Sequence, residues 1–264
     1  MRAAAREEEE LRGSPLAAGA IRAETAESGL VRIRMEKPPV NVLSGSDLED
    51  LASAVEAHPD ARVLLLTGLP RAFSAGVDVS EHAPEPVAIE KMLAAMRRAL
   101  SALVAAPAVT IARVSGACLG GGAEIAAACD VILTAEDSRI GFPEIRLACF
   151  PPGACALLPG RIGAARAAAW ILSGDTVSGR EALEAGFASR CFPAAELARE
   201  TERLAAALLS RGRVALRAAT QLLREDRRAA LKARLPRAED AYRSLAGDAD
   251  LARAVEEFAG RRKT

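Results

Sequence analysis

The chain has 264 residues, of which 50% are hydrophobic but only 3% aromatic, so alanine, leucine and valine must supply most of any core. Lysine plus arginine and aspartate plus glutamate balance at 35 each, which gives no electrostatic basis for binding nucleic acid or an anionic membrane surface. No apolar run approaches the roughly 18 residues of a membrane-spanning helix. We therefore expect one large domain, or a core with an appendage, without a nucleic-acid or membrane partner.

Five cysteines are scattered through apolar or small-residue stretches without a CxxC pair, and the chain has only two histidines. This pattern is typical neither of a zinc site nor of a disulfide framework. The acidic amino-terminal segment also lacks the apolar centre of a secretory signal. We expect buried, reduced thiols in a cytoplasmic protein and no bound metal.

Residues 1–18 are expected to form a solvated tail, and residues 21–35 to form two strands around a turn at Glu27-Ser28-Gly29. A helix should follow, with Ser46 as its N-cap and Leu48, Leu51 and Val55 on its apolar face. The continuous apolar run 63–67 predicts a buried strand, and 87–105 predicts a helix.

The same pattern repeats along the chain, with strand patterns around 108–115, 130–136 and 139–142 separated by a glycine turn and a helix. Such alternation predicts an α/β fold with largely buried sheets. From about Pro193 onward the pattern is helical, with little strand signal. We expect a core over 19–193 that holds the active site and a helical region over 194–264 that makes oligomer contacts; alternatively, those helices only cover one end of the core.

The stretch Val114–Asp130, VSGACLGGGAEIAAACD, contains the most informative motif. Gly120, Gly121 and Gly122 stand where a strand pattern changes to a helical one, although glycine at a helix start costs stability relative to alanine. Without Cβ atoms, the free N–H groups of a first helical turn can approach an anionic oxygen closely. Glu124 is the only charged residue between Arg113 and Asp130. It is therefore either a buried charge that destabilises the fold or a functional group with a raised pKa.

A second carboxylate, Glu144, follows Pro143 in the segment RIGFPEIRLACFPPG. Taken alone, it is more simply a first-turn glutamate that faces water. Together with Glu124 and the glycine-rich turn, it completes a coherent set of groups. One glutamate can take a proton from water, the other can give a proton to carbon, and N–H donors can hold the oxygen on which charge develops.

The loop AFSAGVDVSE offers a second N–H donor to the same oxygen. Gly76 permits close approach of the backbone, and the amide of Val77 could donate, although Ser-Ala-Gly is also ordinary turn chemistry. His82 is a weaker candidate for substrate contact, and His58 is most simply a surface residue. The chain lacks GxGxxG, P-loop and HExxH motifs.

These residues resemble the crotonase, or enoyl-CoA hydratase/isomerase, superfamily. The similar segments are AFSAGVDV, GACLGGGAEIAAACDVILTAEDSRIGFPEIRL and ILSGDTVSGREALEAGFASRCFP, within residues 20–193. The resemblance implies a spiral core of repeated ββα units with a C-terminal helical region that forms trimers or dimers of trimers. It implies an acyl-CoA thioester as substrate, and no metal or redox cofactor.

Carried over by position, the resemblance makes the amides of Val77 and Gly121 the oxyanion hole for the thioester oxygen. It makes Glu124 the base that activates water for addition at C3 and Glu144 the acid that delivers a proton to C2. Further substrate-binding residues would be Ala75, Gly76, Asp78 and Gly120, of which Ala75 and Asp78 lie near the adenine end of coenzyme A.

Both glutamates together favour a hydratase, because family isomerases generally work with a carboxylate at the Glu144 position alone. A double-bond isomerase and a non-catalytic CoA-ester-binding protein remain the alternatives. After Glu144 the chain has PPGACALLPGRIG where ordinary members have approximately PGAGGTQRL, so the acyl pocket should differ from that of straight-chain hydratases. The segments FSAGVDVSEH and PEIRLACFPP look more like hydratases that act on cyclic dienoyl-CoA esters.

Overall fold

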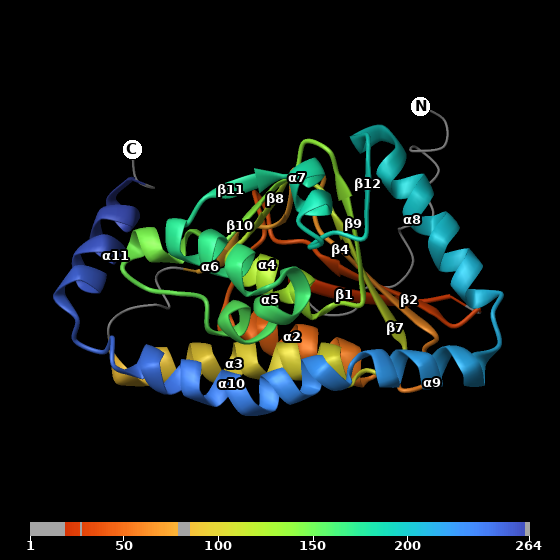
Figure 1. Ribbon diagram of the computed structural model, residues 1–264, viewed down its shortest axis with the longest axis horizontal. Helices are drawn as coiled ribbons and strands as arrows, with labels where there is room; N and C mark the ends of the chain where they lie inside the picture. Colours follow the sequence, from red (N-terminus) through yellow and green to blue (C-terminus); the bar gives the residue numbers. More distant parts are fainter. Residues whose placement is uncertain (1–18, 27, 79–84, 262–264) are drawn as a thin grey trace.

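The computed structural model describes residues 19–26, 28–78 and 85–261, with the side chains of 259–261 left aside. The predicted tail 1–18, Glu27 of the first turn and His82 lie outside the described residues. Within them, the predicted alternation of strands and helices is observed (Figure 1). The strands are β1 Ile21–Thr25, β2 Leu30–Met35, β3 Val42–Leu43, β4 Val63–Thr67, β5 Ala72–Ser74, β6 Gly76–Val77, β7 Val109–Val114, β8 Ala117–Leu119, β9 Val131–Ala135, β10 Arg139–Gly141, β11 Thr176–Ser178 and β12 Arg190–Phe192.

Three sheets organise these strands. The largest has six strands in the order β1-β2-β4-β7-β9-β12, and the second has four in the order β11-β10-β8-β5. β1 pairs antiparallel with β2, but β2, β4, β7, β9 and β12 run parallel, as the buried apolar run of β4 predicts. Because β4, β7 and β9 are each followed by a strand of the second sheet, the chain winds between the two sheets as successive ββ units. β3 and β6 form a separate parallel pair.

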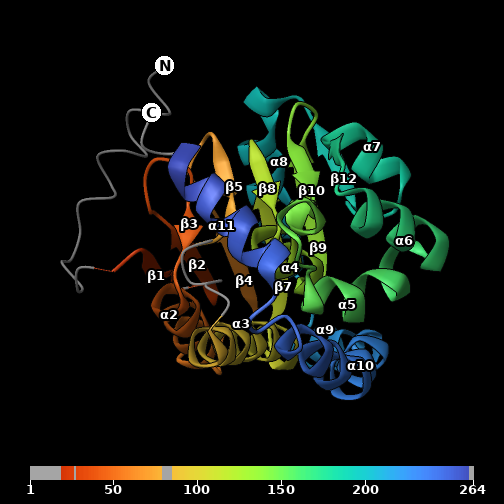
Figure 2. The same ribbon diagram turned by 90° about the vertical axis from the view of Figure 1, so that its left-hand side faces the viewer.

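Helices connect and cover these sheets (Figures 1 and 2). Those of the core are α2 Gly45–Glu56, α3 Pro86–Ala105, α4 Gly121–Ala128, the 3₁₀ helix η2 Pro143–Leu147, α5 Pro152–Ile162, α6 Ala164–Ser173 and α7 Gly179–Glu184. α4 is apolar on all sides except at Glu124, and all eight of its residues are buried. Such a helix belongs in the centre of a domain.

The predicted N-cap of α2 is wrong: Ser44, not Ser46, caps this helix. The Ser44 hydroxyl accepts from the Asp47 amide, and the Asp47 carboxylate accepts in return from the Ser44 amide at 2.7 Å. This reciprocal capping box satisfies two backbone donors, which a cap at Ser46 could not do with Asp47 beside it. Lys37 also donates to Asp47 at 2.6 Å and helps to hold the pKa of that carboxyl below its usual value, against the effect of burial.

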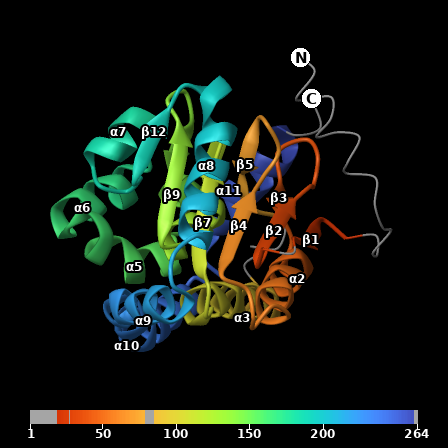
Figure 3. The same cartoon turned by 90° about the vertical axis from the view of Figure 1, so that its right-hand side faces the viewer.

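After Pro193 the described chain is helical, as predicted, with α8 Ala194–Leu209, α9 Arg213–Leu223, α10 Glu225–Arg243 and α11 Ala249–Arg261. α8 packs on the six-stranded sheet (Figure 3), and α10 lies along α3 and α5 (Figure 1). Leu231 and Leu235 of α10 are buried in the main core. These helices thus complete the core, and their predicted role in oligomer contacts stays a prediction.

Arg224, between α9 and α10, is fully buried and fixes this junction to the core. Its guanidinium pairs with Asp130, donating through Nε at 2.7 Å, and it also donates to the carbonyls of Ala106 and Ala108. Arg227 pairs with the same aspartate and donates to the carbonyl of Cys129 at 2.8 Å, just beyond the end of α4. A buried guanidinium with these partners has its donors satisfied, so the cluster is explained as a structural anchor.

The cysteines form no disulfide, and only three of the five are buried as expected: Cys155 and Cys191 are partly exposed. None of the described helices combines the length and apolar character that crossing a membrane requires.

Candidate active site

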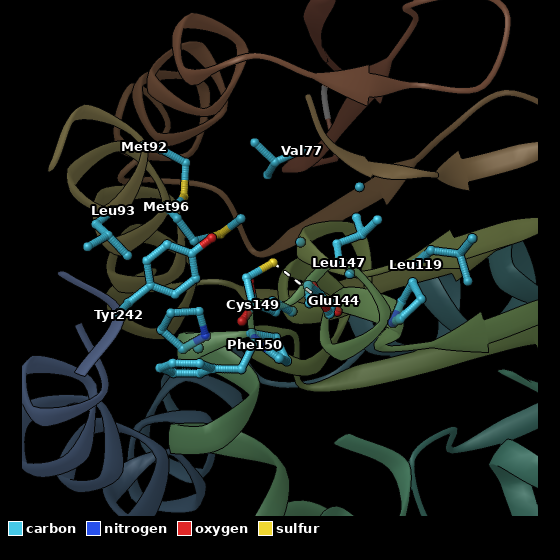
Figure 4. Close-up of a pocket in the computed structure, with 18 of the residues that line it drawn as sticks. Val77, Met92, Leu93, Met96, Leu119, Glu144, Leu147, Cys149, Phe150 and Tyr242 are labelled. Atoms are coloured by element: carbon cyan, nitrogen blue, oxygen red, sulfur yellow. Dashed lines mark hydrogen bonds between the residues drawn. The ribbon is translucent and has the colours of Figure 1, made fainter. Parts of the chain in front are cut away.

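A cavity of about 280 Å³ lies between the N-terminus of α4, the helices α3, α10 and α11, and the segment that follows η2 (Figure 4). Seven of the eight residues predicted for the site line it: Ala75, Gly76, Val77, Gly120, Gly121, Glu124 and Glu144. Asp78 does not line it, and its amide donates to the Leu43 carbonyl at 2.9 Å. The segments that sequence analysis singled out separately therefore converge on one space.

The N-terminal end of α4 lines this cavity with the backbone of Gly120 and Gly121. Gly120, which precedes the helix, has φ +52° and ψ −125°, a conformation suited to glycine. Its own amide donates to the Gly141 carbonyl at 2.9 Å, and the first bond within the turn runs from the Glu124 amide to Gly120. The intervening amides, beginning with Gly121, have no acceptor within the helix, and they carry the positive end of its dipole.

The amide of Val77 approaches Gly121 from β6. A Cβ atom built on Gly121 would lie 3.6 Å from the Val77 nitrogen, and one on Gly76 would lie 3.9 Å from the Gly121 nitrogen. The Asp78 amide donates to the Leu43 carbonyl of β3. Successive amides of a strand point to opposite sides, so the Val77 amide points away from β3. Two backbone N–H groups from distant segments thus lie side by side, which is the arrangement an oxyanion hole requires.

Asn41, which the sequence did not indicate as a site residue, fixes the loop that carries Gly76 and Val77. It is fully buried, has φ +53°, and its amide group donates to the carbonyls of Met35 at 2.8 Å and Phe73 at 3.0 Å. Its own carbonyl accepts from the Ser74 hydroxyl at 2.7 Å, and that hydroxyl accepts from the Gly76 amide at 3.1 Å. An Asn directly before a strand is a weak signal, although Asn tolerates positive φ better than most residues.

Glu124 is 3% exposed, and its carboxylate lies at the N-terminus of α5. Its Oε1 accepts from the Ala154 amide at 2.8 Å, and the amide of the neighbouring Gly153 also favours the ionised carboxylate. Pro151 and Pro152 have no N–H, so Gly153 and Ala154 hold the first free amides of that helix. A Cβ on Gly153 would lie 3.0 Å from Glu124 Oε1, so the PPG segment is shaped to receive this carboxylate.

Glu144 of η2 points into the cavity (Figure 4). Its carboxyl lies against Gly120. A Cβ on Gly120 would lie only 2.7 Å from Glu144 Oε1. Its Oε2 is enclosed and has no hydrogen-bond partner among the described residues. This oxygen thus does not face bulk water, whereas the simpler interpretation expected a first-turn glutamate that faces water.

Burial raises the pKa of both glutamates. Loss of solvation raises the pKa of Glu124 to about 7, although the amides of Ala154 and Gly153 act in the opposite direction. Loss of solvation, followed by the charge of Glu124, raises the pKa of Glu144 to about 8. Two interacting carboxyls of this kind share one proton near neutral pH, so one can act as base while the other acts as acid.

These shifts predict a pH-dependent stability. Because both pKa values are raised from an ordinary 4.5, the folded chain binds more protons than the unfolded chain between about pH 4.5 and 8, and stability must fall as pH rises through that window. We expect a Tm that is lower at pH 8 than at pH 5 by a few degrees. The Glu124→Gln/Glu144→Gln double variant should lose most of this slope in calorimetry, and an unchanged slope would contradict the assignment.

The rest of the cavity wall is mostly apolar and partly aromatic. Phe150 and Tyr242 pack edge to face, with ring centroids 5.3 Å apart, and Phe258 also lines the cavity. Burial raises the pKa of the Cys149 thiol to about 12, so it stays protonated, and its sulfur lies 3.4 Å from the Glu144 carbonyl oxygen to which it donates (Figure 4). This wall can enclose an apolar acyl group beside the two carboxyls.

Comparisons with known proteins agree with this geometry. The sequence model described as enoyl-CoA hydratase/isomerase matches residues 25–264. The chain is 33% identical to the 2,3-dehydroadipyl-CoA hydratase of Escherichia coli K12 over 227 residues, which cover 84% of this chain and 88% of that protein. It is 34% identical over 163 residues, 61% of the chain, to a cyclohexa-1,5-dienecarbonyl-CoA hydratase of Thauera aromatica, and it spans only 62% of the length of that relative.

The fold has close counterparts among solved structures. An enoyl-CoA hydratase from Mycobacterium avium subsp. paratuberculosis K-10 superposes with a TM-score of 0.82 at 26% identity, over 94% of this chain and 97% of that one. The predicted α/β spiral and its C-terminal helices are confirmed by this match.

Proposed function

The chain belongs to the enoyl-CoA hydratase/isomerase family, and from that premise we propose that it is an enoyl-CoA hydratase, which adds water reversibly to an α,β-unsaturated acyl-CoA thioester. The observation that carries the proposal is the pair Glu124 and Glu144, one buried and one partly buried carboxyl with raised pKa values in one cavity beside the amides of Val77 and Gly121. An isomerase, by the resemblance, would need only the carboxylate at the Glu144 position.

In the proposed reaction the thioester oxygen accepts hydrogen bonds from the amides of Val77 and Gly121. The ionised Glu124 takes a proton from water while the water oxygen bonds to C3, and the electron pair of the double bond moves toward the thioester oxygen. The amides stabilise the charge that develops there. The protonated Glu144 then gives its proton to C2, so that one water molecule is added in total.

The amides of Gly153 and Ala154 suit Glu124 to the role of base, because they favour its ionised form. Glu144 has no such donor on its enclosed Oε2, which suits it to hold the proton. Transfer of a proton from Glu124 back to Glu144 restores the starting state. We propose that no cofactor is needed beyond the coenzyme A that the substrate carries, since each proton transfer has its own carboxyl.

The proposal is tested by supplying crotonyl-CoA, a cyclic dienoyl-CoA and a 3-enoyl-CoA separately and following the conjugated thioester absorbance. Loss of absorbance with the first or the second, with a 3-hydroxyacyl-CoA as product from crotonyl-CoA, is the expected result. Conversion of the 3-enoyl ester to the conjugated ester without any hydration would instead identify an isomerase. Tight binding of all three esters without turnover would identify a non-catalytic CoA-ester-binding protein.

For the acyl group, we propose a cyclic dienoyl ester. The support is the relative from T. aromatica together with the cavity wall, where Phe150, Tyr242 and Phe258 gather in a chain that has only 3% aromatic residues. Flat aromatic walls suit a planar unsaturated ring. The expected outcome of the assay above is therefore a higher kcat/KM for the cyclic dienoyl ester than for crotonyl-CoA.

We also propose that the chain assembles as a trimer or a dimer of trimers. Val214, Leu222 and Leu223 of the α9 region are 83%, 65% and 78% exposed in the single chain, which is a large apolar surface for one short helix. Light scattering that finds a monomer at micromolar concentration would contradict this proposal.

A further inference from the structure

Two charged side chains interrupt the apolar wall that α3 and α10 give to the cavity. On α10, Leu235, Glu239 and Tyr242 follow one another on a single face, since they stand at i, i+4 and i+7. On α3, Arg97 adjoins the lining residue Met96. The only charges that the described parts of these two helices place in the cavity lining face each other and pair.

Glu239 is 2% exposed, and only one of its oxygens is satisfied. Its Oε2 accepts from Arg97 Nη1 at 2.5 Å, and Arg243 Nη2 lies 3.9 Å from the same oxygen. Its Oε1 is enclosed and has no hydrogen-bond partner among the described residues. A buried carboxylate oxygen without a donor lowers the stability of the fold, so we expect a hydrogen-bond donor for this atom from outside the described chain.

A purely structural role explains this pair poorly. A tie between α3 and α10 would not need a buried carboxylate oxygen that lacks a donor, since such an atom costs free energy, whereas Arg224 in its structural cluster has its donors satisfied. Arg97, in contrast, has a side chain that is 41% exposed, and only its Nη1 bonds to another side chain among the described residues. The pair therefore combines an enclosed carboxylate oxygen that lacks a donor with a partly exposed guanidinium, on two residues that line the cavity.

We propose that Glu239 and Arg97 recognise a hydroxyl group on the acyl part of the substrate, away from the thioester. The hydroxyl hydrogen would be donated to Glu239 Oε1, and the hydroxyl oxygen would accept from the guanidinium of Arg97. The charges of the pair cancel, so a neutral group that both donates and accepts fits it better than a carboxylate, which Glu239 would repel, or an ammonium group, which Arg97 would repel. This inference adds a hydroxyl substituent to the acyl group of the proposed hydratase substrate, whether that group is cyclic or open-chain, and it rests on that function.

The test measures binding without turnover, so that it is independent of the hydratase assay. Calorimetric titration would compare saturated CoA thioesters of six and eight carbons that end in a methyl, a hydroxyl or a carboxylate group. For the wild-type protein we expect the hydroxyl ester of one of these lengths to bind about tenfold more tightly than its methyl and carboxylate counterparts. Equal affinities at both lengths, or a preference for the carboxylate, would overturn the proposal.

Variants separate recognition from folding. Glu239→Leu should abolish the preference for the hydroxyl ester. Glu239→Gln should keep part of this preference. It should also bind the carboxylate ester more tightly than the wild type does, because the negative charge that repels the carboxylate is gone. Glu90→Gln is the matched control. Glu90 lies on α3, as Arg97 does, and its carboxylate pairs with Arg243, but it does not line the cavity. This variant should bind all the esters as the wild type does. Should Glu239→Leu fail to fold, Glu239→Gln alone decides: unchanged selectivity there would refute the role of Glu239.

If the protein shows the expected selectivity yet hydrates no enoyl-CoA ester, the proposed function fails and the binding inference stands. If it hydrates crotonyl-CoA or the cyclic dienoyl ester but shows no selectivity, the reverse holds.

Discussion

Replacing Glu124 by glutamine is expected to lower kcat for hydration by roughly 10²- to 10⁴-fold, with the Kd of a saturated acyl-CoA changed no more than a few-fold. The glutamine amide cannot take a proton from water, but its carbonyl oxygen can still accept from the amide of Ala154. Glu144→Gln should cause a loss of the same order, because C2 then has no proton donor. Stopped-flow or steady-state absorbance assays with crotonyl-CoA or the cyclic dienoyl ester measure both effects.

The two losses should not add in the double variant, because the carboxyls act as a unit on one water molecule. Glu136→Gln is a suitable control, since Glu136 pairs with Arg180 on the surface and does not line the cavity. Loss of activity through unfolding is distinguishable, because both active-site variants should be at least as stable as the wild type at pH 8, where they lack a buried charge. Full hydratase activity in Glu124→Gln would refute its role as base.

The second large effect is expected from Gly120→Ala, which should reduce kcat by roughly 10²-fold. This is the lower end of the rate loss that follows when a general acid, here Glu144, is displaced. The added methyl group would lie 2.7 Å from Glu144 Oε1, and a carboxyl side chain can turn away more easily than the backbone can move. The φ of +52° and ψ of −125° would also strain an alanine by about 1–3 kcal/mol. Kinetics and thermal unfolding together separate these two consequences.

Gly160→Ala is the control for that substitution. A Cβ on Gly160, in α5, meets nothing within 4 Å, and this glycine is exposed and does not line the cavity. Alanine there should leave kcat unchanged and stabilise the helix by about 0.5–1 kcal/mol. A Gly120→Ala variant with wild-type kcat would show that the position of Glu144 against Gly120 does not matter for the reaction.

Much of this architecture could be predicted because its signals are local. The buried run of β4 and the glycine-to-alanine change at the start of α4 each lie within a few residues of sequence. The spacing of Glu124 from Glu144, with the loop around Val77, matched a known family, and the family match confirms that resemblance. The structure then brings these residues to one cavity, and their chemical roles stay predictions until variants are assayed.

What the sequence left open depends on contacts between distant segments. Two serines lie near the start of α2, and Ser44 is the N-cap because its amide and hydroxyl form a capping box with Asp47. The PPG segment indicated an altered acyl pocket, but not that the first amides of α5 would hold the Glu124 carboxylate, 30 positions earlier in the chain. Glu239 and Arg97 are 142 positions apart, so no periodicity in either helix could predict their pairing.

The most direct test is a crystal structure of the protein with bound 3-hydroxybutyryl-CoA, the hydration product of crotonyl-CoA. We predict a thioester oxygen within about 2.7–3.1 Å of the amide nitrogens of both Val77 and Gly121. The C3 hydroxyl should lie within hydrogen-bonding distance of Glu124, with Glu144 facing C2. A thioester oxygen that contacts neither amide, or a C3 hydroxyl remote from both glutamates, would contradict the account.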